Sequence, residues 1–111
     1  MPHNIPESDW KTFRELREAA LQRFCKRVLE ELLSLIRDDS RSHHERYLAV
    51  FGLIQERDEQ LAHAFNEPAR SRMIIQLAAI HALGLLLPGE LERFTQDTRR
   101  VIEPLTKEST K

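Results

Sequence analysis

Residues 9–37 form one long segment in which apolar side chains recur every three or four positions and neither proline nor glycine occurs. That spacing is typical of an amphipathic helix. A helix of this length measures roughly 43 Å at about 1.5 Å per residue. A compact domain of this size has a radius of gyration of only about 13 Å. The helix is therefore predicted to project beyond the rest of the chain.

Three further segments complete the helical prediction. Ser42 followed by Glu45 has the pattern of a capping box and predicts a second long helix that ends near Phe65. Residues 69–83 are apolar in nearly every direction and predict a buried third helix. Two short helices over 88–94 and 96–103 follow, the second ended by a proline. The expected fold class is all-α: an antiparallel helical bundle of two long helices, one buried central helix and a short C-terminal helical hairpin.

The chain is expected to form a single helical domain over residues 1–111, with flexible ends at 1–7 and 105–111. Cys25 is the only cysteine, which excludes an intrachain disulfide and fits a reducing compartment. The first residues lack the pattern of a signal peptide, and the longest apolar run is too short to span a bilayer. The sequence thus predicts a cytoplasmic protein with no membrane partner.

The apolar positions of the first helix cover about half of its circumference, whereas a helix with one partner needs a stripe only a little wider than about 100°. The surplus must be covered either by the third helix of the same chain or by a second subunit. Length and width together favour a homodimer. The candidate interaction face consists of Phe24, Val28, Leu29, Leu32, Leu33 and Ile36.

Two charged residues interrupt the apolar stripes. Arg17 falls within the stripe of the first helix and Asp58 within that of the second. An unpaired buried charge is very unfavourable, so we expect the two to form an ion pair across the hairpin.

The charge balance argues against a dedicated nucleic-acid binder. Lys and Arg number 17 and Asp and Glu 18, so the phosphate attraction that supplies most of such affinity is missing in bulk. A local cluster keeps a nucleic-acid-associated regulator open as the alternative function. Its candidate residues are Arg70, Arg72, Arg93, Arg99 and Arg100.

Signals of catalysis are absent from the sequence: there is no glycine-rich phosphate loop, and no serine lies in a Gly-x-Ser-x-Gly context. Glu59 and His63, four residues apart, are weak candidates for a metal, but di-iron bundles need Glu-x-x-His and residue 60 is a glutamine. A metal-binding or enzymatic bundle is the third interpretation. The leading hypothesis is a non-enzymatic interaction or regulatory module, without cofactor, that acts as a homodimer.

Overall fold

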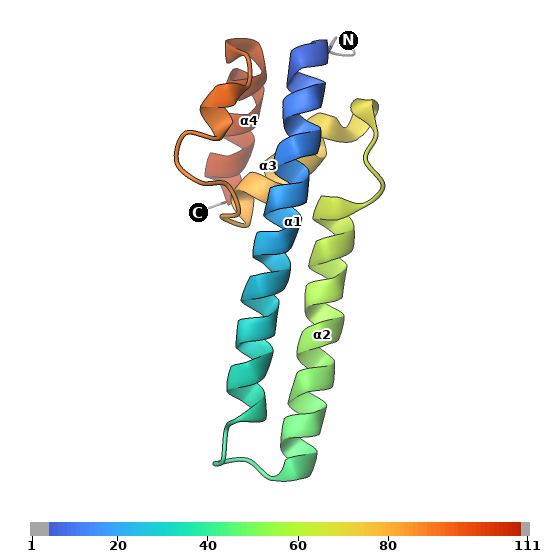
Figure 1. Cartoon of the computed structure of the whole chain (residues 1–111), viewed down its shortest axis with the longest axis vertical. Coiled ribbons are helices and arrows are strands. Elements are labelled where there is room, and N and C mark those ends of the chain that lie inside the picture. Colours follow the sequence, from blue (N-terminus) through green and yellow to red (C-terminus); the bar gives the residue numbers. More distant parts are fainter. Residues whose placement is uncertain (1–4, 110–111) are drawn as a thin grey trace.

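The computed structural model describes residues 5–109, and within that range it contains helices and no strand. Four α-helices follow one another along the chain: α1 (Glu7–Ile36), α2 (His43–Phe65), α3 (Met73–Ala82) and α4 (Gln96–Ser109). Single 3₁₀ turns precede α3 (Arg70–Arg72) and α4 (Leu91–Arg93). α1 and α2 form a long antiparallel hairpin, and α3 and α4 pack at one end of it (Figure 1). This confirms the predicted all-α bundle.

The turn of the hairpin is held by the predicted capping box. The Ser42 hydroxyl accepts the Glu45 N–H at 3.1 Å, and the Glu45 carboxylate accepts the Ser42 N–H at 2.8 Å. Arg46 in the next turn donates to the Ile36 carbonyl at 2.8 Å. The start of α2 therefore caps its own first turn and also satisfies a free carbonyl at the end of α1.

The hydrophobic core lies entirely at the end of the hairpin where the chain begins, a region we call the head. The Phe24 and Phe65 rings, 5.9 Å apart, mark the limit of this core along the hairpin. Below them, the two long helices continue without α3 or α4 (Figure 1). The buried apolar residues are Phe13, Leu16, Ala20, Phe24, Ala64, Phe65, Met73, Leu77, Ile80, Leu85, Phe94 and Ile102.

Three arginines of α1 fasten the head. Arg17 donates to the Phe65 carbonyl at 2.6 Å, at the end of α2. Arg27 donates to the carbonyls of Leu83 and Gly84, just after α3. Between them, Arg23 donates to the Leu85 carbonyl and to Glu90. Cations at helix C-termini satisfy carbonyls that lack an intrahelical partner and interact favourably with the helix dipole.

α3 is shorter and less buried than predicted. The residues after Pro68 are extended or in a 3₁₀ turn, so the α-helix begins at Met73 rather than at residue 69. One face of it is buried, but Ile75 is 57% exposed, because no element covers that side. Gly84, two residues after α3, has a φ of +71°, a conformation that glycine adopts without strain.

The C-terminal region also differs from the prediction. Residues 88–94 form a turn and a 3₁₀ segment rather than an α-helix. Pro104 does not end α4, which continues to Ser109; a proline removes one hydrogen bond but does not by itself stop a helix that packs against another element, as α4 packs on α3. Residues 105–109 are thus helical, and Ile5 packs against the core, whereas 1–4 and 110–111 lie outside the described residues.

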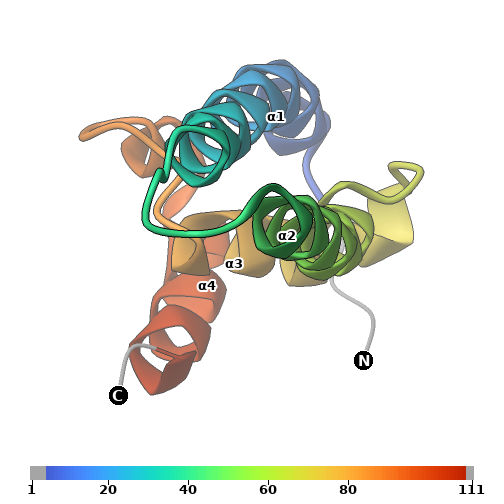
Figure 2. The same cartoon turned by 90° about the horizontal axis from the view of Figure 1, so that it is seen from below.

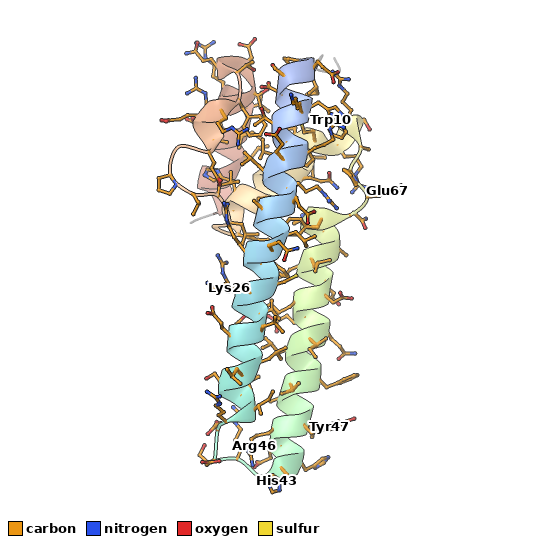
Figure 3. The ribbon with its side chains drawn as sticks, in the orientation of Figure 1. Trp10, Lys26, His43, Arg46, Tyr47 and Glu67 are labelled. Carbon is orange, nitrogen blue, oxygen red and sulfur yellow. The ribbon has the colours of Figure 1, made fainter. Side chains whose placement is uncertain are left out.

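The predicted overhang of the long helix is confirmed. The radius of gyration is 16.7 Å and the molecule measures 53 × 25 × 22 Å, well beyond the roughly 13 Å radius of a compact chain of this size. Trp10 lies in the head and Lys26 about half-way along the hairpin, while Arg46 and Tyr47 lie near its tip (Figure 3). We call the half of the hairpin from residue 25 to residue 58 the distal hairpin; its first turn, with Val28 and Arg27, still contacts the head, and the rest projects alone.

Candidate functional site

The distal hairpin has an interior, a polar side and an apolar side. Its interior is half-buried, because only two helices contribute to it. The half-buried residues that helical spacing directs inward there are Val28, Leu32 and Leu35 of α1 and Val50 and Leu53 of α2. Arg57 also reaches across and forms two hydrogen bonds of 3.0 Å with Glu31.

One side of the distal hairpin is apolar and uncovered. The exposed fractions are 65% for Leu29, 67% for Tyr47 and 54% for Phe51. At 100° per residue, three exposed apolar positions of each helix lie about a quarter turn from the interior, in the same sense, whereas Leu48, 52% exposed, lies about half a turn away. Because the two helices run in opposite directions, the same sense of rotation brings these residues of α1 and α2 to one side of the hairpin. We call this set the apolar hairpin face: Leu29, Leu33, Ile36, Tyr47, Phe51 and Ile54.

The opposite side of the same segment is polar or small. Helical spacing places Arg27, Glu30 and Ser34 of α1 there, all exposed. The α2 residues of this side are Glu45, Ala49, Gly52 and Glu56. The distal hairpin is therefore amphipathic as a unit, with an apolar side directed away from the head's own α3.

Shallow grooves between α1 and α2 show what borders the apolar hairpin face. Near the head, Asp58 lines a groove together with Leu29 and Ile54. Near the tip, His43 lines another together with Ile36 and Tyr47. The apolar hairpin face is thus bordered by the carboxylate of Asp58 at the end near the head and by the imidazole of His43 at the end near the tip.

The interaction face predicted from the first helix is divided by the structure. Phe24 belongs to the core, and Val28 and Leu32 lie in the half-buried interior of the hairpin. Leu29, Leu33 and Ile36 are exposed. The α2 half of the face was missed, although the apolar residues of that helix also spread wider than one partner requires.

The predicted ion pair between Arg17 and Asp58 is not present. Arg17 donates to the carbonyls of Phe65 and Asn66, whereas Asp58 is exposed beside Leu29. The reason is the register of the hairpin, which places Arg17 level with the end of α2 and not with Asp58, two turns earlier. The arginine satisfies carbonyls instead of a carboxylate.

The arginines considered for nucleic acid do not form one free cluster. Arg70 forms an ion pair of 2.9 Å with Glu7, and Arg93 one of 2.7 Å with Glu15. Arg99 is half-buried, and Arg72 and Arg100 are exposed. Two of the five positive charges are thus neutralised by α1.

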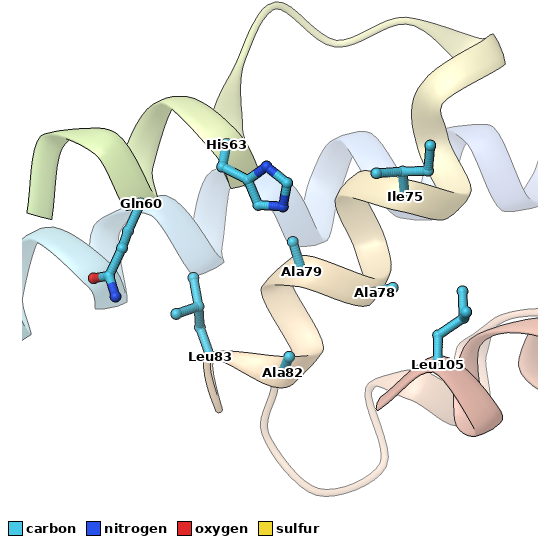
Figure 4. A pocket seen from close by; sticks show the side chains of 8 residues that line it. All are labelled: Gln60, His63, Ile75, Ala78, Ala79, Ala82, Leu83 and Leu105. Carbon is cyan, nitrogen blue, oxygen red and sulfur yellow. The ribbon is translucent and has the colours of Figure 1, made fainter. Parts of the chain in front are cut away.

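The two weak candidates for a metal, Glu59 and His63, do not line the same groove. His63 points into an apolar groove between α2, α3 and α4, and Gln60 is its polar neighbour there (Figure 4). Glu59 does not line this groove, whose other residues are Ile75, Ala78, Ala79, Ala82, Leu83 and Leu105. Within the described part of the chain, no three His, Cys, Asp or Glu side chains gather as a metal site would require.

Two partly exposed ion pairs each shift the pKa of a glutamate. Hydrogen bonds from Arg57 lower the pKa of Glu31, and hydrogen bonds from Arg23 lower the pKa of Glu90, in each case against the opposing effect of burial. Arg57 and Glu31 join the two helices of the distal hairpin, and Arg23 and Glu90 join α1 to the segment before α4. Both pairs are structural links between elements.

Comparison with known proteins gives no family: no family model, no curated protein and no solved structure matches this chain. Among the helices of residues 5–109, none combines the length and apolar character needed to cross a membrane.

Proposed function

We propose that this protein is a non-enzymatic interaction module that associates with a second copy of itself through the apolar hairpin face. The observation that carries the proposal is the exposure of six large apolar side chains on one side of a projecting hairpin. The head's core does not need this surface, which lies beyond Phe24 and Phe65.

The area of the face supports a dimer. If the full surface of a large apolar side chain is about 200 Å², the exposed area of the six residues adds up to roughly 650 Å². A stable interface of standard size buries about 800 Å² on each partner. The six residues alone supply most of that area, and contiguous apolar patches of this size mark interaction sites.

The shape of the face supports the same partner. Two amphipathic helices side by side form half of a four-helix bundle, and a second identical hairpin would complete it with helices 8–10 Å apart, the usual distance. The contribution of Tyr47 and Phe51 is also typical, since aromatic residues are enriched in interface cores.

Two pairs of neighbouring substitutions test the proposal. Leu33→Glu and Ile54→Glu place a charge within the face, whereas Ser34→Glu and Gln55→Glu place the same residue outside it. We expect size-exclusion chromatography with light scattering to give a dimer for the two controls and a monomer for the two face variants, with unchanged helical content. A wild-type monomer, or dimers for all four variants, would contradict the proposal.

A further inference from the structure

We infer that the two copies pack antiparallel about a two-fold axis that passes between Leu33 and Phe51, so that His43 of each copy meets Asp58 of the other. This inference rests on the proposed function and specifies the arrangement of the partner. It follows from the spacing of residues along the apolar hairpin face.

The residues of the face are arranged symmetrically about its centre. On α2, Tyr47 and Ile54 lie at equal distances on either side of residues 50 and 51, and so do His43 and Asp58. On α1, Leu29 and Ile36 lie equally far from residues 32 and 33. A two-fold axis across the hairpin brings each residue against its counterpart in the other copy, because such an interface is self-complementary.

The charges at the ends of the face favour this orientation. Asp58 borders the face near the head and His43 borders it near the tip, and both are exposed. In the antiparallel pair, an imidazole N–H of one copy can donate to the carboxylate of the other at both ends of the interface. In a parallel pair, α1 of one copy would lie over α2 of the other and Asp58 would face Cys25, so neither polar group would gain this partner.

The shape of the head favours the same orientation. The connection from α2 to α3, residues 66–72, stands out on the side of the hairpin away from α4 (Figure 2). The apolar hairpin face also points away from α3 and α4. In a parallel pair the two connections would meet at the same height. In the antiparallel pair each lies beyond the tip of the other copy.

Cross-linking of single-cysteine variants tests the orientation. In a Cys25→Ala background, His43→Cys and Asp58→Cys are prepared separately, and each is oxidised alone and in an equal mixture. We expect a disulfide-linked dimer in the mixture and at most a trace in either variant alone, since a disulfide needs Cα atoms within about 7 Å. A mixture that cross-links no more than the separate variants, while sedimentation still gives a dimer, would overturn the antiparallel arrangement and leave the proposed function intact.

A charge exchange tests the contact itself. His43→Glu places two carboxylates opposite each other, and Asp58→Lys places a lysine opposite the imidazole. Each substitution is expected to weaken dimerisation about tenfold at low salt. His43→Glu and Asp58→Lys together restore an opposite pair and should recover most of the loss. Glutamate is favourable in the first turn of α2, so damage to the helix would not explain a weaker dimer. A double variant as weak as the sum of the single ones would contradict the pairing.

Discussion

The carboxylate of Asp9, near the start of α1, accepts a hydrogen bond of 2.6 Å from the hydroxyl of Thr98 in the first turn of α4. The same carboxylate accepts the N–H and the hydroxyl of Thr95 at 2.9 and 2.7 Å. Asp9 is only 1% exposed, and within residues 5–109 the hydrogen-bond donors to its carboxylate are all neutral. Asp9 thus joins the start of α1 to the start of α4. The three neutral donors replace the hydrogen bonds to water that the carboxylate loses when it is buried.

Asp9→Ala is expected to lower the free energy of unfolding by about 3 kcal/mol, because three donors lose their acceptor and one of them, the Thr98 hydroxyl, is buried. Urea denaturation followed by circular dichroism measures the change. Asp97→Ala, an exposed acidic residue at the start of α4, is the control and should cost under about 1 kcal/mol. Equal losses for the two variants would contradict the role given to Asp9.

Arg17→Met keeps the aliphatic part of the side chain but removes the donor to the Phe65 carbonyl. We expect a loss of about 1–2 kcal/mol in the free energy of unfolding, the usual cost of an unsatisfied, partly buried acceptor. Lys11→Met, an exposed position of the same helix, should change stability by less than about 0.5 kcal/mol. If Arg17→Met is as stable as this control, the arginine does not hold the end of α2.

The pH dependence of stability should include a contribution from Glu90. Hydrogen bonds from Arg23 lower its pKa in the folded protein below the ordinary value of 4.5, so the unfolded chain binds the proton more readily. The stabilisation is complete above that value and is lost as the pH falls below 4.5 through the folded pKa.

Glu90→Gln removes this contribution. The variant should be about 1 kcal/mol less stable than the wild type at pH 7, and the difference should narrow between pH 4.5 and the acid limit. Unfolding in urea at a series of pH values gives both curves. Parallel curves across this range would show that the Arg23–Glu90 pair has no effect on the pKa of the glutamate.

The sequence predicted what depends on local spacing. The capping box at Ser42 and Glu45 involves residues three apart, and the overhang of α1 follows from its uninterrupted length. The partners of Arg17 and Asp9 were missed because they lie 48 and 86–89 residues away. A signal for Asp9 was nevertheless present: it lies four residues before Phe13, on the same buried stripe of α1.

The candidate site was half predictable for a related reason. The excess width of the apolar arc on α1 identified Leu29 and Leu33 as needing a partner. Which apolar residues of α2 remain outside the hairpin depends on how that helix is rotated against α1, and periodicity alone does not fix this rotation. The structure fixes it and leaves Tyr47 and Phe51 exposed.

Phe51→Glu should separate association from folding. Phe51 lies near the two-fold axis of the inferred dimer, so a glutamate there would face its own copy across the interface. Like charges in direct opposition oppose association in addition to the lost apolar contact. We expect a folded monomer with the helical circular dichroism of the wild type. A Phe51→Glu variant that still forms a dimer would place the interface elsewhere.

Sedimentation equilibrium of the wild-type protein over a range of concentrations is the most direct measurement of the central claim. If the apolar hairpin face binds a second copy, the fitted mass rises with concentration to twice the 13.0 kDa of one chain and does not rise further, because a two-fold interface is closed. A fitted mass of one chain at every concentration up to about 0.5 mM, roughly five hundred times a Kd of 1 µM, would contradict the proposed dimer.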